Sequence, residues 1–307
     1  MRIIIELPSW LGDTVMATPA IQNLIDYFND PDITLVGSSV AISTFANHPR
    51  ISKTYVLEKK YFGFYNAISG YGNFDIFFSF RGSLRSKFLK FFVSAQRKYQ
   101  FNNKKYSNCH QVEKYNSFIN DSLNIKLSAK KLKIYKKEKI INKKNRLLGI
   151  NPGATYGSAK RWYPKEFAEV AIALSNDYDI LIFGAASELD MANEIEYFLT
   201  KKNIKNFSNL AGKTSIQDLI SYISYLDLFV TSDSGPMHLA AAFQVPTVSI
   251  FGPTRVSETS QWMNEKNAIV KRDLQCQPCM KRVCPLKHHN CMKFVTAKDV
   301  LNEVSGF

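Results

Sequence analysis

The sequence predicts an α/β protein of two domains, each built on a parallel sheet with helices on both faces. Its 307 residues suffice for about two domains. Short apolar runs alternate with stretches in which apolar residues recur at helical spacing, which is typical of strand–helix–strand units. The alternation occurs in two series. We therefore place one domain at 1–145 and a second at 146–307, with the last helix a candidate for packing back on the first domain.

The first series begins with a buried strand at 2–7 and a helix at 13–28, in which apolar residues recur at helical spacing: Val15, Ile21, Leu24, Ile25 and Phe28. The spacing of Leu84, Phe88 and Phe91 predicts a further helix after the fourth strand. The later strands of this series are predicted at 33–37, 54–57 and 75–80.

The second series repeats the pattern. Helices are predicted at 164–175, through Ile195 and Phe198, and after Gly235. The strands of this series are predicted at 147–151, 179–184, 227–231 and 247–252.

The charge is strongly basic and unevenly spread. Lys and Arg number 40 against 26 Asp and Glu, a net charge of +14. The stretch 130–146 has nine basic residues and one acidic residue, Glu138, and so contributes +8 of that net charge. Leu132, Ile134 and Tyr135 could form an edge strand there. The stretch is either a solvated face or a surface attracted to anionic lipid. No nucleic-acid-binding motif accompanies the charge, which disfavours a nucleic-acid partner.

Targeting features are not apparent. The first apolar run meets Glu6 at once, which is too short for a signal peptide, and no window of about 18 apolar residues could span a bilayer. Five cysteines, four of them near the C-terminus, do not resemble a secreted disulfide framework. We therefore expect a cytoplasmic protein.

Ligands of parallel sheets bind beyond the carboxyl ends of the strands, so two such domains predict a cleft between their sheets. The loop 8–13 follows the first strand and contains Gly12 and Asp13. Asp13 could cap the following helix. It could equally act as a general base at the mouth of the cleft.

Three loops of the second series are candidates for ligand binding, two of them for an anion. The loop 151–162 combines two glycines and two hydroxyl groups with Lys160 and Arg161, which favours a phosphate site. The loop 231–238 places Ser234 and Gly235 at a helix N-terminus, a ready anion site. Beside them, Asp233 could cap or bind a hydroxyl group, and His238 could be structural or functional. In the loop 183–188, Glu188 could bind ribose or stabilise a helix start.

Two further patterns remain. Asp177 and Asp179 form an acidic pair that precedes a strand, so we interpret it as a turn rather than a metal site. Near the C-terminus, four cysteines lie within sixteen residues, with His288 and His289 among them. They could bind a structural zinc ion or iron–sulfur cluster, or remain reduced thiols. These are Cys276, Cys279, Cys284 and Cys291.

Three motifs, taken together and in order, resemble the lipopolysaccharide heptosyltransferases of glycosyltransferase family nine. They are Pro-Ser-Trp-Leu-Gly-Asp at 8–13, Pro-Gly-Ala-x-x-Gly-x-Ala-Lys-Arg-Trp at 152–162 and Ser-Asp-Ser-Gly-x-x-His at 232–238. The resemblance extends from Arg2 to the C-terminal helix, although 50–145 contribute little. The cysteine segment is similar to a version found in many members.

The resemblance implies a GT-B fold, with two Rossmann-like domains facing a central cleft. It implies metal-independent, cofactor-independent and inverting transfer of L-glycero-D-manno-heptose from ADP-heptose to the inner core of lipopolysaccharide. The expected acceptor is heptosyl-Kdo-lipid A, which receives the second heptose, and transfer of the first heptose is the alternative. Such an acceptor suits the basic charge and predicts a protein peripheral on the inner face of the inner membrane.

The resemblance also implies roles for individual residues. Asp13 would be the general base. The acceptor would meet the 8–13 loop and the basic residues after the fourth strand, through Ser9, Trp10, Gly12, Arg81, Arg85 and Lys87. The donor would be bound by Thr155, Lys160, Arg161, Glu188, Asp233, Ser234, Gly235 and His238.

Two rival functions stay open. One is another GT-B enzyme, such as a sugar-nucleotide epimerase, although no second carboxylate near Asp13 supports it. The other is a basic binding protein for nucleic acid or membrane with a metal-bound cysteine module.

Overall fold

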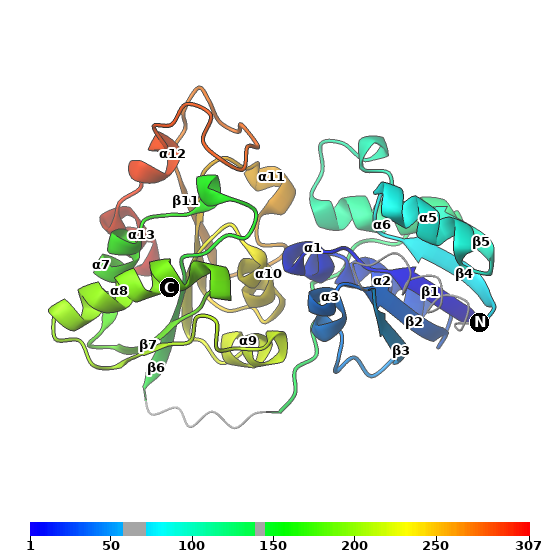
Figure 1. Cartoon of the computed structure of the whole chain (residues 1–307), viewed down its shortest axis with the longest axis horizontal. Coiled ribbons are helices and arrows are strands. Elements are labelled where there is room, and N and C mark those ends of the chain that lie inside the picture. The colour runs from blue at the N-terminus through cyan, green and yellow to red at the C-terminus, as the bar shows by residue number, and fades with distance from the viewer. Residues whose placement is uncertain (58–71, 139–144) are drawn as a thin grey trace. The chain divides into compact units, whose positions relative to one another are not determined.

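The computed structural model describes residues 1–57, 72–138 and 145–307. Its contacts group the chain into two compact units, Met1–Tyr135 and Lys136–Phe307 (Figure 1). Each unit is an α/β unit with its own parallel sheet, as predicted. The domain boundary expected at residue 145 adjoins the undescribed segment 139–144 and stays a prediction.

The N-terminal unit contains a five-stranded parallel sheet in the order β3-β2-β1-β4-β5. Its central strand β1 is buried on both faces, with Ile3, Ile4 and Ile5 fully inaccessible, as expected for a sheet covered by helices. The strands are β1 (Arg2–Glu6), β2 (Asp32–Gly37), β3 (Ile51–Val56), β4 (Phe74–Ser79) and β5 (Ala95–Gln100).

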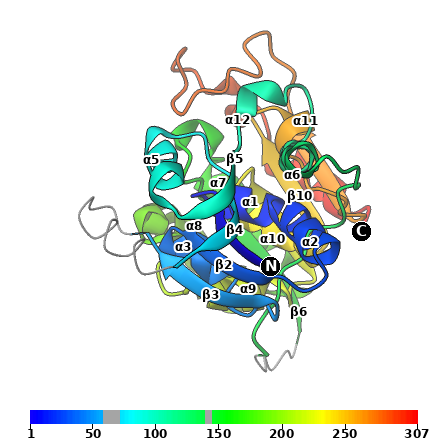
Figure 2. The same cartoon turned by 90° about the vertical axis from the view of Figure 1, so that its right-hand side faces the viewer.

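The predicted helix at 13–28 is two helices that meet at Ala17, and the first begins two residues before Asp13. Pro19 explains the break, because proline lacks an N–H group and its ring crowds the carbonyl of residue i−4, here Val15. The Thr18 hydroxyl donates to that carbonyl instead, at 2.7 Å. The helices of this unit are α1 (Leu11–Met16), α2 (Thr18–Tyr27), α3 (Ser39–Thr44), α5 (Leu84–Phe92) and α6 (Gln111–Leu123), seen from a second side in Figure 2.

The stretch 125–138 is not the edge strand that its apolar residues suggested. Its backbone forms hydrogen bonds with side chains rather than with a neighbouring strand. Asn116 and Asn120 donate to the carbonyl of Leu127, and Thr18 accepts from the amide of Lys133. Leu132 is buried, although the residues around it form no strand. Its cations are also engaged, since Lys130 pairs with Asp26 at 2.6 Å.

The C-terminal unit contains a six-stranded parallel sheet in the order β11-β10-β9-β6-β7-β8. Three neighbouring strands, β9, β6 and β7, end at the same edge and carry the loops that the sequence analysis selected. The strands are β6 (Arg146–Asn151), β7 (Tyr178–Ile182), β8 (Phe207–Asn209), β9 (Leu228–Ser232), β10 (Thr247–Phe251) and β11 (Asn267–Lys271).

The helices of the C-terminal unit follow its strands. The last of them packs on α7, β10 and β11 of its own unit, and a return to the N-terminal unit stays a prediction. Asp177 lies in a turn before β7, as interpreted from the sequence, and Asp179 lies in the strand. The helices are α7 (Pro164–Leu174), α8 (Leu189–Lys201), α9 (Ile216–Ile223), α10 (Gly235–Ala242), α11 (Val256–Thr259), α12 (Asn290–Lys293) and α13 (Ala297–Val304). None of the helices within the described ranges has the length and apolar character needed to cross a bilayer.

Candidate active site

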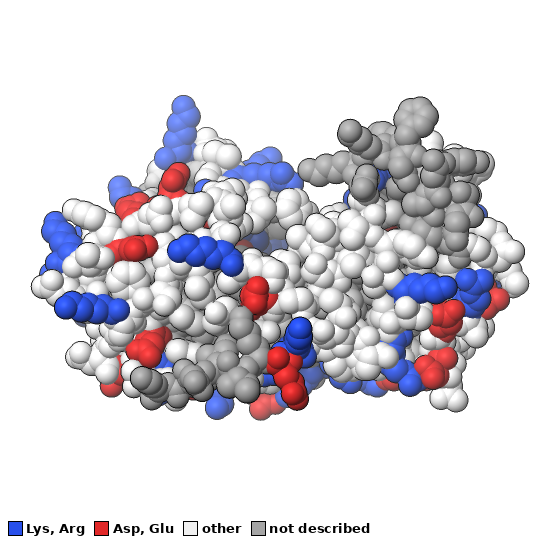
Figure 3. Space-filling view, turned by 60° about the horizontal axis from the view of Figure 1, so that its bottom comes forward, with Lys and Arg blue, Asp and Glu red and all other residues white. Residues whose placement is uncertain are grey.

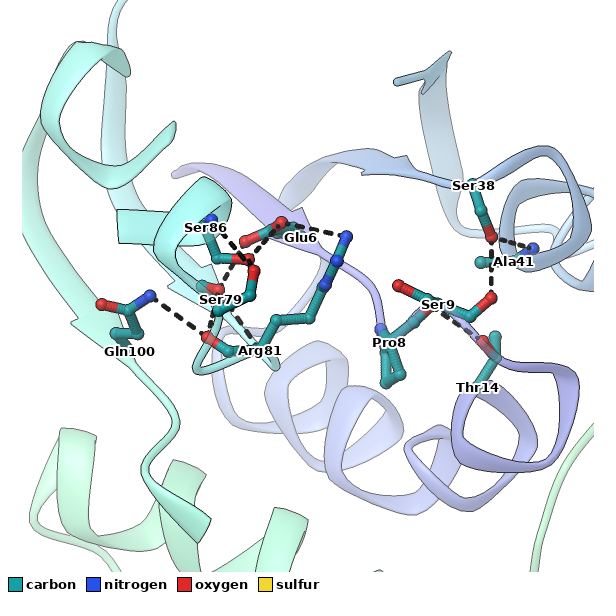
Figure 4. A network of polar contacts seen from close by, with 11 residues as sticks. Glu6, Pro8, Ser9, Thr14, Ser38, Ala41, Ser79, Arg81, Ser86 and Gln100 are labelled. Atoms are coloured by element: carbon teal, nitrogen blue, oxygen red, sulfur yellow. Dashed lines mark hydrogen bonds and ion pairs between the residues drawn. The ribbon is translucent and has the colours of Figure 1, made fainter. Parts of the chain in front are cut away.

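The loop that follows β1 is fixed by hydroxyl groups from its neighbours. The Ser38 hydroxyl, after β2, donates to the carbonyl of Ser9 at 3.0 Å and accepts from the amide of Ala41 (Figure 4). The Thr14 hydroxyl donates to the carbonyls of Pro8 and Trp10. The loop therefore holds one conformation at the carboxyl edge of the sheet.

Asp13 lies in the first turn of α1, and the N-cap position is occupied by Trp10, which makes no side-chain cap hydrogen bond. The capping role considered for Asp13 is therefore wrong. The side chain of Asp13 is half-buried. Burial, and secondly the nearby charge of Asp13, raise the pKa of Tyr115 on α6 well above its ordinary value. The Asp13 carboxylate is thus close enough to this buried phenol, which the sequence did not indicate, to affect its pKa.

A second carboxylate, Glu6, is buried at the end of β1 with 1% of its surface exposed. Its oxygens accept from the hydroxyls of Ser79 at 2.5 Å and Ser86 at 2.8 Å, and Arg81 lies 3.5 Å away (Figure 4). Desolvation raises the pKa of Glu6, against the lowering effect of these partners. This network holds Arg81, a predicted acceptor contact, at the carboxyl edge.

The other predicted acceptor residues also lie at this edge or just after it. Trp10 is exposed, and Ser9 and Gly12 are half-buried. Arg85 is half-buried on α5, and Lys87 is exposed on the same helix.

In the C-terminal unit, Lys160 and Asp233 form a buried ion pair. Their Nζ and Oδ2 atoms are 2.6 Å apart, and the side chains are 11% and 3% exposed. The Thr254 hydroxyl, after β10, donates to the same Asp233 oxygen at 2.6 Å. Asp233 therefore does not cap α10, which was one of its two proposed roles. The structure brings together residues 73 positions apart in the sequence.

The N-terminus of α10 has no side-chain cap. Ser234 is the N-cap residue, but its hydroxyl is engaged by Asn151 and Thr231, both at 3.2 Å. Pro236 occupies the first turn of the helix, as expected. The uncapped backbone N–H groups and the helix dipole favour an anion here. His238 is buried one turn further along α10.

The two carboxylate oxygens of Glu188 differ in their contacts among the described residues. Its Oε2 atom accepts from the amide of Ala185 at 2.8 Å, in a capping box. Its Oε1 atom is buried, and no hydrogen-bond partner for it appears within the described ranges. The carboxylate lies against Gly153, where an added Cβ would be 2.0 Å from Glu188 Oε2. Both roles considered for Glu188 are therefore compatible with the structure.

The remaining donor candidates differ in exposure. Thr155 is exposed in the 151–162 loop, and Arg161 is half-buried. The Nε atom of Arg161 is buried, again with no partner in the described part of the chain.

The cysteine-rich segment packs directly on the 151–162 loop. The amide of Ala159 donates to the carbonyl of Arg282 at 3.0 Å, and the Tyr156 hydroxyl donates to the carbonyl of Met280 at 2.8 Å. His289 Nε2 lies 3.0 Å from the carbonyl of Ala159. The segment therefore supports the loop that contains Lys160.

All four cysteines of this segment line one cavity of about 20 Å³, together with His288 and His289. The thiols are free. Burial, followed by the three other cysteines, raises the pKa of Cys291 to about 11. Within the described residues, no three His, Cys, Asp or Glu side chains are placed to hold a metal ion. The four thiols thus face one common cavity, and both the structural-metal and the reduced-thiol alternatives stay open.

The contact between these segments makes Gly157 sensitive to substitution. A Cβ atom there would lie 2.3 Å from the backbone oxygen of Arg282. We expect Gly157→Ala to destabilise the fold by about 1–3 kcal/mol, because a well-packed backbone must shift. The prediction that Lys160 binds the donor implies a rise in the KM for the donor as well, because Lys160 shifts with the loop. Thermal unfolding and donor kinetics measure both. Gly306→Ala, where the nearest atom is 3.4 Å away, is the control. Unchanged stability and KM in Gly157→Ala would contradict the inference that the cysteine-rich segment supports the loop containing Lys160.

Comparison with known proteins identifies the family. The profile of glycosyltransferase family 9 (heptosyltransferase) matches residues 70–290. The chain is 44% identical to lipooligosaccharide heptosyltransferase 2 of Campylobacter jejuni serotype O:2, with 100% of this chain and 98% of that protein covered. It is 25% identical to the corresponding Haemophilus influenzae protein, over 88% of each.

The fold agrees with this result. The structure of Escherichia coli ADP-heptose lps heptosyltransferase II superposes with a TM-score of 0.84 at 20% identity, with 100% of this chain and 98% of that chain covered. The predicted GT-B fold is therefore confirmed, and the epimerase and the simple binding protein are no longer alternatives. The chain belongs to glycosyltransferase family 9, the heptosyltransferases, and is a glycosyltransferase.

Proposed function

We propose that this enzyme transfers a heptose from ADP-heptose to the inner core of lipopolysaccharide, and that it adds the second heptose. The observation that carries the proposal is the 44% identity over the whole chain to a protein named lipooligosaccharide heptosyltransferase 2. The basic charge of +14 suits an anionic glycolipid acceptor and the anionic inner-membrane surface.

The donor end of the reaction is assigned to the C-terminal unit. The diphosphate of ADP-heptose is bound by Lys160, Arg161 and the uncapped N-terminus of α10, with Thr155 beside them. As the bond to the leaving ADP breaks, negative charge grows on the phosphate, and these groups stabilise it. The buried Oε1 of Glu188 is a ready acceptor for a ribose hydroxyl, since no partner engages it within the described residues. Asp233 holds the ammonium group of Lys160 in place. His238 completes the wall of the donor site from α10.

The acceptor end is assigned to the N-terminal unit. The acceptor hydroxyl attacks the anomeric carbon as the bond from that carbon to the phosphate oxygen breaks on the opposite face. The configuration inverts, ADP leaves, and the hydroxyl proton passes to the Asp13 carboxylate. Ser9, Trp10 and Gly12 form the loop beside Asp13, and Arg81 and Arg85 bind acidic groups of the acceptor. The Glu6 network supports this role because it orients Arg81.

The function is tested by ADP release. The protein is incubated with ADP-heptose alone, with a soluble Kdo acceptor, and with the same acceptor bearing one heptose. We expect ADP release that depends on the heptosyl-Kdo acceptor, with a product one heptose heavier by mass spectrometry. Release with the Kdo acceptor alone would assign the first-heptose reaction instead. No release with either acceptor would overturn the proposal.

A further inference from the structure

Helix α5 exposes an apolar stripe. Leu84 and Phe91 are 74% and 77% exposed, Phe88 is 56% exposed, and Phe92 is 45% exposed. At about 3.6 residues per turn, these positions fall on one side of the helix. Their spacing is the pattern that predicted the helix, but the structure turns the stripe outward rather than into the core.

The opposite side of α5 is fixed in the protein. Leu89 is fully buried in a cluster with Ile4, Phe74 and Phe77. Ser86 is fully buried as well, and its hydroxyl donates to Glu6. Ser83 caps the N-terminus of the helix. The stripe therefore belongs to a well-anchored helix, and clustered apolar exposure of this kind marks a contact surface.

The charge around the stripe has one sign. No acidic residue occurs between Asp75 and Glu113. Arg85 follows Leu84 and Lys87 precedes Phe88, which places one cation on each side of the stripe. The Nζ atom of Lys98 donates to the carbonyl of Phe91 at 3.2 Å. The basic residues of this segment are Arg81, Arg85, Lys87, Lys90, Arg97, Lys98, Lys104 and Lys105.

The cysteine-rich segment also exposes apolar side chains among basic residues, Val283, Leu286 and Phe294, but they do not form a stripe along one helix. On the face drawn in Figure 3, basic and acidic side chains are interspersed among the described residues. Several cations of the stretch 130–146, the membrane candidate from the sequence, have partners inside the protein. Lys130 pairs with Asp26, and Lys136 lies over the ring of Tyr225 at 3.9 Å. The α5 surface thus replaces that stretch as the stronger candidate.

We propose that α5 docks the enzyme on the surface of an anionic lipid bilayer. The Phe and Leu side chains enter the boundary between headgroups and acyl chains, and the flanking Arg and Lys side chains reach lipid phosphates along their alkyl stems. The charge around the stripe is only basic. This favours an anionic lipid surface over a neutral protein partner, because each Lys or Arg near anionic lipid adds to binding.

The docking surface continues into the acceptor end of the enzyme. Ser86 on α5 and Arg81 both contact Glu6, so the helix and the acceptor arginine share one support (Figure 4). The inference rests on the proposed function only in placing the glycolipid acceptor in the same bilayer. Binding to lipid without acceptor tests it separately.

The test uses the full-length protein and sedimentation with vesicles of phosphatidylcholine, with or without phosphatidylglycerol. The test variant is Phe88→Ser/Phe91→Ser, and Lys90→Glu tests the charge. The matched control is Tyr197→Ser/Phe307→Ser, which removes two aromatic rings that are 59% and 46% exposed in the C-terminal unit. Thermal unfolding confirms that each variant is folded.

We expect the wild type and the control to bind vesicles that contain phosphatidylglycerol. The lipid concentration at half-binding should rise at least tenfold for Phe88→Ser/Phe91→Ser and about fivefold or more for Lys90→Glu. Binding should also weaken in high salt. With a soluble acceptor, ADP release by all variants should equal that of the wild type.

Four results would overturn the inference. They are no vesicle binding by the wild type, equal binding to neutral vesicles, unchanged binding by the Phe variant, and conversion of a dimer to a monomer by that variant. The last would assign the stripe to contact between two copies of the chain. Absence of activity toward soluble acceptors with lipid binding intact would instead overturn the proposed function and leave the docking surface standing.

Discussion

Asp13→Asn is expected to lower kcat for heptose transfer by about 10²–10⁴-fold, the usual contribution of a general base. The amide has nearly the shape of the carboxylate but cannot take the proton of the acceptor hydroxyl. Because Asp13 is half-buried in α1 and does not cap the helix, the fold should survive the change. Acceptor-dependent ADP release measures kcat, and calorimetric titration with ADP measures donor affinity, which should be unchanged.

The matched control for Asp13→Asn is Asp26→Asn. Asp26 lies on the next helix and pairs with Lys130 at the surface, where both side chains are about half exposed. Its loss should change kcat by less than about twofold, since exposed pairs contribute little. If Asp13→Asn keeps most of the wild-type kcat, Asp13 is not the base. If it loses ADP affinity to the same degree as kcat, the residue acts on donor binding instead.

Lys160→Met is expected to lower the free energy of unfolding by about 3–5 kcal/mol, because it leaves the buried Asp233 carboxylate without its cation. The Thr254 hydroxyl alone does not neutralise the charge. ADP affinity should fall as well, since the cation nearest the proposed diphosphate site is lost. Urea denaturation gives the first quantity, and calorimetric titration gives the second.

A double substitution separates the two effects. In Lys160→Met/Asp233→Asn neither member of the pair is charged, and the amide can still accept from Thr254. Stability should therefore recover by much of the loss in the single variant, whereas ADP affinity should not. The control Lys165→Met breaks an exposed pair 3.7 Å long and should change stability by less than about 0.5 kcal/mol. Recovery of ADP affinity in the double variant would mean that Lys160 serves the fold and not the donor.

Local sequence patterns predicted the central strands of both sheets better than the edge strands. The central strands are apolar runs and were predicted within a few residues. The edge strand β3 was predicted in part, at 54–57, whereas the edge strands β5, β8 and β11 were not predicted. Their sequences, such as Ala-Gln-Arg-Lys-Tyr-Gln in β5, are half-exposed and polar. One neighbouring strand and the polarity of an edge leave little apolar periodicity to detect.

Local sequence patterns did not predict the contacts between loops either. The three loops were predicted at strand ends, and the structure places them there. Thr254 and Tyr115, however, carry no local motif, and each matters because a distant segment brings a carboxylate beside it. Such pairs depend on strand order, which is decided by packing of the whole sheet.

By itself, the sequence determined that two parallel sheets form and that their carboxyl-end loops carry Asp13, Lys160 and Gly235, because strand and helix periodicity and turn chemistry are local properties. Only the tertiary structure decided that Lys160 is buried against Asp233, that Glu6 holds Arg81, and that the Phe side chains of α5 face outward. An apolar stripe predicts a helix wherever it faces. Which side of that helix meets the core depends on the strands beneath it, and those are supplied by residues far away in the chain.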